Sequence, residues 1–166
     1  MSESPVRCIA KQRSPANQRA AIALALLSVS LFSCAGKRPS DLGVENGRLA
    51  ACPSSPNCVS SEADDRIHGV PAFRLTTEPN RAWAAARQAV LDLPRTELVV
   101  DEPGYLHAEC RSALMGFVDD LELHLRPDES RIEVRSASRL GYGDLGVNRR
   151  RVEGLRTNLR KLGRVE

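Results

Sequence analysis

The sequence predicts an α+β domain: an antiparallel β-sheet of four to five strands with two helices packed on one face, in the order β-α-β-β-β-β-α. Two observations predict this fold. Apolar residues recur at helical spacing in two segments, residues 80–91 and 147–162. Between the helices lie four strand-like stretches joined by short turns of Pro, Gly, Asp and Ser, at residues 96–100, 105–112, 118–125 and 131–138.

The strand before the first helix is expected at residues 70–75, where Pro71 restricts it to a sheet edge or a strand start. Thr76 or Thr77 is expected to cap the helix, because a hydroxyl oxygen accepts from the free amides of the first turn. Pro94 ends this helix. The second helix is expected to face the core with one apolar stripe, formed by Val152, Leu155, Leu159 and Leu162.

Composition indicates one globular domain, which we place at residues 49–166. The chain has 166 residues, 42% hydrophobic and 27% charged, and both values are ordinary for a single folded unit. The formal charge of +3 comes from residues 1–33, which hold four basic residues and one acidic residue. The rest of the chain has twenty of each, and this neutral charge argues against a nucleic-acid partner.

An uncharged apolar run of thirteen residues, 20–32, follows a basic segment near the start of the chain. It is shorter than the roughly 20 residues of a spanning helix. It has the form of a secretory signal peptide, which we place at residues 1–33. The run ends in Leu31-Phe32-Ser33-Cys34, which resembles a bacterial lipobox, although Phe32 stands where a small residue is commoner. The alternative is a short signal-anchor helix with an incidental cysteine.

The lipobox resemblance implies that Cys34 is acylated and begins the mature protein. The chain would then be exported and held to a membrane by its acyl chains. Ala35 follows in place of Asp, which under the usual sorting rule favours the outer membrane, facing the periplasm. Residues 34–48 are polar, contain Gly and Pro and lack periodicity, so we expect a lipid-anchored tether there.

Three more cysteines remain in what would be an oxidising compartment. Cys52 and Cys58 close a seven-residue loop stiffened by two prolines, which favours a structural disulfide. No metal is predicted, because this spacing is not that of a zinc knuckle and no second Cys or His pair follows. A redox role, mixed pairing with Cys110 and free thiols stay as alternatives.

Strand alternation places a carboxylate on the core face of the sheet. If apolar residues stay together across the hairpins, one inward row contains Cys110, Asp119 and Ser138. A buried carboxylate needs a partner. The simplest is a bidentate arginine, Arg139 or Arg149, and the neighbouring Asp120 is the other candidate acceptor.

The last helix opens with Asn-Arg-Arg-Arg at residues 148–151, and three arginines in a first turn oppose the helix dipole. Something anionic must offset their charge. Besides an internal aspartate, an external phosphate, carboxylate or lipid headgroup would do so, held by side chains and helix amides. The candidate ligand-binding residues for such a small anion are Ser136, Ser138, Arg139, Asn148 and Arg149.

Acid–base catalysis is a competing hypothesis, and its weak candidates are His107, Glu109, Asp119 and Asp120. His107 and Glu109 share one face of a strand, which is one or two ligands short of a metal site. An outward lattice of ion pairs explains both more simply; its other members are Arg111, Glu122 and Arg135. Neither a Gly-x-Ser-x-Gly elbow nor a phosphate-binding loop occurs, so no cofactor is predicted and an enzymatic role stays open.

Three blocks together carry a family resemblance: Cys-Pro-Ser-Ser-Pro-Asn-Cys and its continuation at 52–61, residues 105–112 with 116–122, and residues 134–151. They resemble the domain-of-unknown-function family catalogued under the number 1499, over about residues 49–162. The resemblance implies an exported or membrane-associated bacterial protein, with relatives in plastids, and it carries no established activity. Cys110 departs from the aromatic or aliphatic residue usual at its position, which argues against a catalytic thiol.

We therefore expect a cell-envelope lipoprotein with one disulfide-pinned domain and a non-enzymatic role. It would bind a small anionic ligand or an envelope partner through the loop from Arg139 to Arg151. An envelope enzyme with an Asp/His/Arg acid–base site is the alternative.

Overall fold

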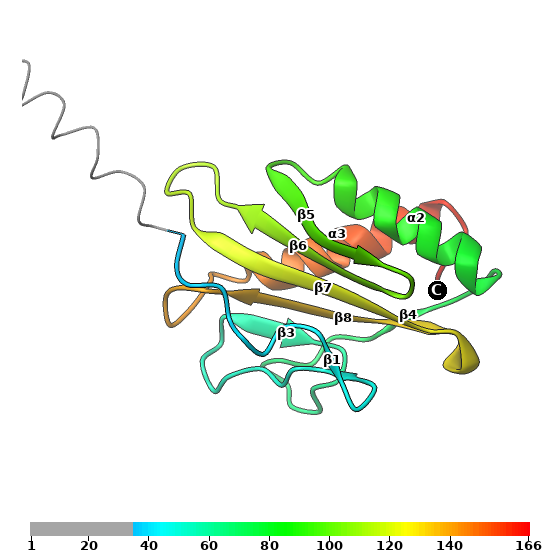
Figure 1. The fold of residues 1–166 in the computed structure, drawn as a ribbon, viewed down its shortest axis with the longest axis horizontal. Coiled ribbons are helices and arrows are strands. Elements are labelled where there is room, and N and C mark those ends of the chain that lie inside the picture. Colours follow the sequence, from blue (N-terminus) through cyan, green and yellow to red (C-terminus); the bar gives the residue numbers. More distant parts are fainter. Residues whose placement is uncertain (1–34) are drawn as a thin grey trace, which may run out of the picture. The chain divides into compact units, whose positions relative to one another are not determined.

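The computed structural model describes residues 35–166, and Figure 1 shows the fold of this part of the chain. The expected signal peptide, residues 1–33, and the expected acylation site, Cys34, lie outside the described residues. In the part that is described, no helix has the length and apolar character needed to span a bilayer.

Six strands form one antiparallel sheet in the order β3-β8-β7-β6-β5, and β4 pairs with the other end of β8. A separate hairpin, β1–β2, precedes the sheet in the chain. The strands are β1 (Val44–Glu45), β2 (Arg48–Leu49), β3 (Cys58–Ser60), β4 (Phe73–Arg74), β5 (Thr96–Glu102), β6 (Tyr105–Arg111), β7 (Val118–Arg126) and β8 (Arg131–Ser138). A 3-10 turn, η2 (Pro127–Glu129), joins β7 to β8.

Two helices, α2 (Pro79–Leu91) and α3 (Val147–Lys161), cover one face of this sheet (Figure 1). Their apolar stripes pack on the side chains that β6, β7 and β8 present to them. The core so formed includes Phe73, Val90, Leu106, Leu121, Leu123, Ile132, Val134, Val152, Leu155 and Leu159. The α+β class predicted from the sequence is confirmed.

The strand count differs from the expectation of four to five. Residues 58–60 join the sheet edge as β3, which no apolar alternation marks in the sequence. The strand expected at 70–75 is reduced to Phe73–Arg74. These two short strands share β8 as their partner, so together they complete one edge of the sheet.

The helix ends also differ in detail. Neither Thr76 nor Thr77 is the N-cap of α2: that residue is Glu78, whose side chain makes no capping hydrogen bond. Thr76 donates instead to the carbonyl of Gly163. Leu162 is 51% exposed at the end of α3, so the apolar stripe of this helix stops one turn earlier than predicted.

The face opposite the helices is covered by residues 36–44, which we call the N-terminal strap, and by the β1–β2 hairpin (Figure 1). Arg38 of the strap donates to the carboxylate of Glu109, and the amide of Gly43 donates to Glu122 at 2.8 Å. Part of the segment expected as a tether, residues 34–48, therefore contacts the sheet. The sheet is covered on both faces.

The disulfide predicted between Cys52 and Cys58 is present. Cys58 is the first residue of β3 and pairs with Ala137 of β8, so the bridge fastens the entry segment to the sheet edge. Among the described cysteines, Cys110 is free and buried.

Replacing both bridge cysteines is expected to lower the free energy of unfolding by about 2–2.5 kcal/mol, because the seven-residue loop no longer restrains the unfolded chain. Urea denaturation of the Cys52→Ser/Cys58→Ser variant and of the wild type measures the difference. A reducing agent should cause a similar loss in the wild type and no further loss in the variant. Equal urea midpoints for the two proteins would contradict this account of the bridge.

Candidate functional site

The sheet face beneath the strap carries a layer of buried charged side chains, which we call the polar layer. They alternate with the core residues along β6, β7 and β8, and the sequence pattern placed them outward. These side chains do lie on the face away from the helices, but the N-terminal strap and the β1–β2 hairpin cover that face. The members of the polar layer, each no more than 5% exposed, are His107, Glu109, Asp120, Glu122, Glu133 and Arg135.

Asp120 lies at the centre of the polar layer. Its two oxygens accept from Arg139, at 2.8 Å from Nε and 2.7 Å from Nη2, and Oδ1 also lies 2.8 Å from His107 Nε2. Nη2 of the same arginine donates to Glu109 at 2.7 Å. The bidentate contact between Asp120 and Arg139 is one of those considered from the sequence. One guanidinium thus holds carboxylates from two neighbouring strands.

Glu122 fixes the strap to the sheet. Its carboxylate accepts three hydrogen bonds: from the amide of Gly43 at 2.8 Å, from the hydroxyl of Tyr105 at 2.9 Å and from Nη1 of Arg135 at 3.0 Å. The Glu122 side chain is fully buried. Because a buried carboxylate is costly without partners, these contacts favour one position of the strap over others.

The charge states of the polar layer follow from its hydrogen bonds. Burial raises the pKa of the Asp120 carboxyl, but the bonds from Arg139 and His107 outweigh burial and hold this pKa below its usual value. The pKa of Glu109 is lowered by the same balance of burial against arginine contacts. Burial and an adjacent carboxylate raise the pKa of the Tyr105 phenol far above its usual value. At neutral pH both carboxyls are ionised and the phenol is protonated.

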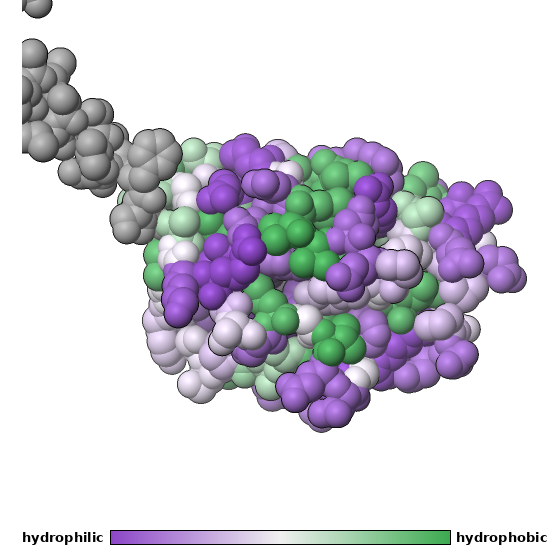
Figure 2. Space-filling view, viewed as in Figure 1, coloured by the Kyte–Doolittle hydropathy of each residue, from purple (hydrophilic) through white to green (hydrophobic). Residues whose placement is uncertain are grey.

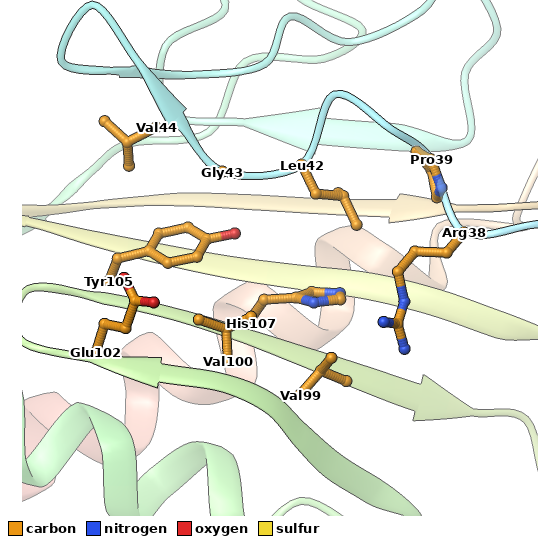
Figure 3. Close-up of a pocket in the computed structure, with 10 residues that line it drawn as sticks. All are labelled: Arg38, Pro39, Leu42, Gly43, Val44, Val99, Val100, Glu102, Tyr105 and His107. Atoms are coloured by element: carbon orange, nitrogen blue, oxygen red, sulfur yellow. The ribbon is translucent and has the colours of Figure 1, made fainter.

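A pocket of about 460 Å³ lies between the strap and strands β5 and β6 (Figure 3). Its volume is in the range of small-molecule sites. Figure 2 shows apolar surface on this face of the domain with hydrophilic surface around it. The lining residues are Arg38, Pro39, Leu42, Gly43 and Val44 from the strap, Val99, Val100 and Glu102 from β5, and Tyr105 and His107 from β6.

The imidazole of His107 lies in this pocket between Tyr105 and Arg38 (Figure 3), and its side chain is 2% exposed. Because ionised Asp120 only accepts, Nε2 of His107 must carry the proton of their hydrogen bond. In the neutral ring, Nδ1 then has a lone pair, and no donor contacts it within residues 35–166. An imidazole oriented in this way accepts a hydrogen bond, or a proton, from a molecule in the pocket.

The residues predicted to bind an anion are divided between the two faces of the sheet. Ser136, Ser138 and Asn148 meet on the helix side, where Asn148 accepts from Ser136 at 2.7 Å and donates to Ser138 at 2.9 Å. Arg139 lies on the other face, in contact with the polar layer. Arg149 donates to two backbone carbonyls of the loop before β4. Every one of these side chains has a partner within the protein.

Asp119 lies on the helix side, in the row with Cys110 and Ser138 that strand alternation predicts. Its partner is Arg151 of α3, with Nη2 2.6 Å from Oδ2, rather than either of the arginines considered from the sequence. The same guanidinium also donates to Ser136 and Asn148. This ion pair ties the first turn of α3 to β7.

Of the four weak catalytic candidates, Glu109, Asp119 and Asp120 are held by arginines, and only His107 presents an open polar atom to a pocket. Sequence reasoning missed the contribution of the strap to this site, because its residues show no periodicity. Within residues 35–166, no three His, Cys, Asp or Glu side chains converge in a way that suits a metal ion.

Removing Arg139 is expected to raise the pH at which the domain unfolds in acid. With their pKa values held below normal in the folded state, Asp120 and Glu109 contribute stability that is present above about pH 5 and is lost as the pH falls through the depressed values. Without the guanidinium, burial raises those values, and protonation begins at higher pH.

Acid titration of Arg139→Gln, followed by circular dichroism, measures the shift. The matched control is Arg87→Gln, which breaks a half-exposed ion pair with Asp101 and should move the midpoint little. Equal midpoints for the two variants would show that the Arg139 contacts do not control acid stability.

Comparison with known proteins identifies the family. Residues 48–159 match the family described as a protein of unknown function, DUF1499. The match covers more than half of the chain and contains strands β2 to β8, all of α2 and all of α3 except its last two residues. No curated protein matches the sequence. The chain therefore belongs to the DUF1499 family of proteins of unknown function.

Proposed function

We propose that this chain is a cell-envelope lipoprotein that binds a small molecule in the pocket beneath the N-terminal strap, without catalysis. The observation that carries the proposal is His107 Nδ1, a polar atom of a nearly fully buried side chain that lines the pocket and has no donor near it among the described residues. This atom is open to the pocket, and its lone pair is satisfied either by water or by a hydrogen-bond donor of a ligand that displaces the water.

The lining indicates the chemistry of the ligand. Val99, Val100 and Leu42 offer apolar contact, and the Tyr105 ring lies beside His107. Two charged groups line the pocket, the Glu102 carboxylate and the Arg38 guanidinium, and the guanidinium is already paired with Glu109, so the Glu102 charge disfavours a free anion. We infer a small ligand with an apolar body and a hydroxyl or amine group.

This site differs from the anion-binding loop expected from the sequence. The side chains expected to bind the anion are paired with one another, with backbone carbonyls or with buried carboxylates, so an anion would have to displace existing hydrogen bonds. Breaking these hydrogen bonds costs free energy, which new contacts with the anion would have to offset. The pocket under the strap requires no such displacement, and we favour it for this reason.

An envelope enzyme is the alternative function. His107, oriented by Asp120, has the arrangement of a general base. The carboxyl groups of Asp120 and Glu109, which the catalytic hypothesis pairs with His107, are ionised and bound to arginines, and this makes them poor proton donors. Binding needs only the open nitrogen, and catalysis needs a second proton-transfer group, so binding is the simpler proposal.

The proposed location rests on the sequence. The run at 20–32 and the lipobox-like end at Cys34 favour export and acylation, and Ala35 favours the outer membrane facing the periplasm. Such an anchor would hold the strap close to a membrane, because residue 36 follows Cys34 after a single residue. The small ligand, or the envelope partner considered from the sequence, would then be met in that compartment.

Cyclohexanol is expected to bind the domain of residues 35–166 and to shift the ¹⁵N resonance of His107 Nδ1, because its hydroxyl donates to that atom. His107→Gln retains an amide donor for Asp120 and removes Nδ1. The loss of one net hydrogen bond should weaken binding about three- to ten-fold, measured by NMR titration.

Two controls accompany this titration. His124→Gln changes a histidine of β7 that does not line the pocket, and it should leave the affinity unchanged. Cyclohexanecarboxylate should bind more weakly than the alcohol. Saturable shifts at Ser136, Ser138 and Asn148 instead of His107 would move the ligand site to the loop expected from the sequence.

Cells that express the full chain in the presence of radioactive palmitate are expected to label it, because Cys34 accepts the acyl chains. Cys34→Ser should lose the label, and Cys110→Ser should retain it. A label that survives Cys34→Ser, or a wild type that takes up none, would contradict the acyl anchor and favour a retained apolar run instead.

A further inference from the structure

Exposed apolar side chains gather at one end of the domain. Of the eleven large hydrophobic residues that are exposed in the described chain, seven lie in the β6–β7 loop or between β8 and the start of α3. Leu114 and Leu145 are the most exposed, at 91% and 93%. We call this group the apolar tip, and its other members are Met115, Phe117, Leu140, Tyr142 and Val147.

The two loops of the apolar tip lie side by side. The amide of Ser112 donates to the carbonyl of Phe117 at 2.8 Å, which closes the first loop. The amide of Arg139, where the second loop begins, donates to the carbonyl of Val118 at 3.1 Å, where the first loop ends. Both loops therefore leave the same end of the sheet, as Figure 1 shows.

The described chain begins at this same end (Figure 1). Gly36 lies against the second loop so closely that a Cβ on it would be 2.9 Å from Arg139 and 3.0 Å from Leu140. Its φ of +67° also favours glycine. Ala35 is thus held beside the apolar tip, and the proposed acylation site is the residue before it.

The charges around the apolar tip suit a phospholipid surface. Residues 112–117 contain no charged residue, and Asp144 of the second loop is occupied as an acceptor for backbone amides at the start of α3. Three exposed cations lie in the strap or beside the two loops: Lys37, Arg150 and Arg111, of which Arg111 also contacts Glu109. Protein surfaces that enter the bilayer interface typically combine exposed aliphatic side chains, an aromatic residue such as tyrosine, and surrounding cations.

We propose that the apolar tip inserts into the surface of the phospholipid bilayer to which the chain is anchored. The proposal rests on the membrane anchor of the proposed function, in either its acylated or its retained-run form. The bilayer then covers Leu114 and Leu145, and α3 points away from the membrane. Leu162, at the far end of this 15-residue helix, lies roughly 22 Å farther from the surface.

Fluorescence quenching by brominated lipids tests the proposal on the full chain, purified from membranes and reconstituted in vesicles of phosphatidylcholine and phosphatidylglycerol. Leu114→Trp and Leu145→Trp each place an indole in the apolar tip. Leu162→Trp is the matched control, a leucine of similar context that is exposed at the other end of α3. The wild type, whose single Trp is Trp83 of α2, gives the background that is subtracted from each variant.

Bromine in the acyl chains is expected to quench the indoles of Leu114→Trp and Leu145→Trp several-fold more strongly than that of Leu162→Trp, and to leave Trp83 unaffected. Equal quenching at the three positions overturns the proposal. A blue shift of Leu145→Trp that depends on protein concentration and not on bromine also overturns it, because a second copy then covers the apolar tip.

The mass of the purified chain separates failure of this proposal from failure of the anchor. An acylated chain with equal quenching at both ends contradicts only the insertion of the apolar tip. A chain that carries no acyl group and does not sediment with vesicles contradicts the membrane anchor, and insertion with it. A chain that carries no acyl group but still sediments with vesicles corresponds to the retained-run form of the anchor. The same quenching comparison then tests insertion of the apolar tip.

Discussion

The contact of Arg139 with Asp120 and Glu109 is the interaction on which the polar side of this domain depends. Carboxylates from two neighbouring strands lie buried on one face of the sheet, and a single guanidinium forms ion pairs with both. Asp120, once fixed, orients the imidazole of His107. Glu109, once fixed, receives Arg38 of the strap. One of the two attachments of the strap therefore depends on this arginine, and the other is the hydrogen bond from Gly43 to Glu122.

The two faces of the sheet are covered in different ways. On the helix side, burial of apolar side chains provides most of the stability, because it removes a large area from water. This stabilisation does not depend on the direction of individual contacts. On the strap side, hydrogen bonds and ion pairs hold a short segment over charged side chains. Buried ion pairs add little net stability relative to apolar packing, but they require a definite arrangement of partners. The position of the strap is thus determined by the geometry of its hydrogen bonds and ion pairs more than by the apolar area that it buries.

Much of the helix-side structure was predictable from the sequence because apolar periodicity reports burial against other apolar groups. Both helices, the three long hairpins and the inward row with Asp119 follow from that pattern. The disulfide followed from loop length and spacing. By contrast, an outward charged side chain has the same sequence pattern whether water or a strap covers it. The lattice of ion pairs expected around His107 accordingly did not include Asp120, which is its partner on the next strand.

The partners of the arginines were harder to predict for a related reason. A first turn with three successive arginines indicates that an anion is near, but the direction of each side chain depends on where the helix meets the sheet. Arg151 reaches Asp119, while Arg149 turns to backbone carbonyls of a loop some eighty residues away in sequence. Contacts between segments so far apart leave no local pattern to read.

The same sequence separation sets the order in which the strap side forms. Arg38 and Glu109 are 71 residues apart, and Gly43 and Glu122 are 79 apart. Closing such long loops is slow relative to pairing adjacent strands. In a chain that emerges amino end first, the strap has no surface to bind until β6 and β7 have been made and paired. The earliest segment of the domain to appear is therefore among the last to become ordered, and the pocket matures only after the apolar core.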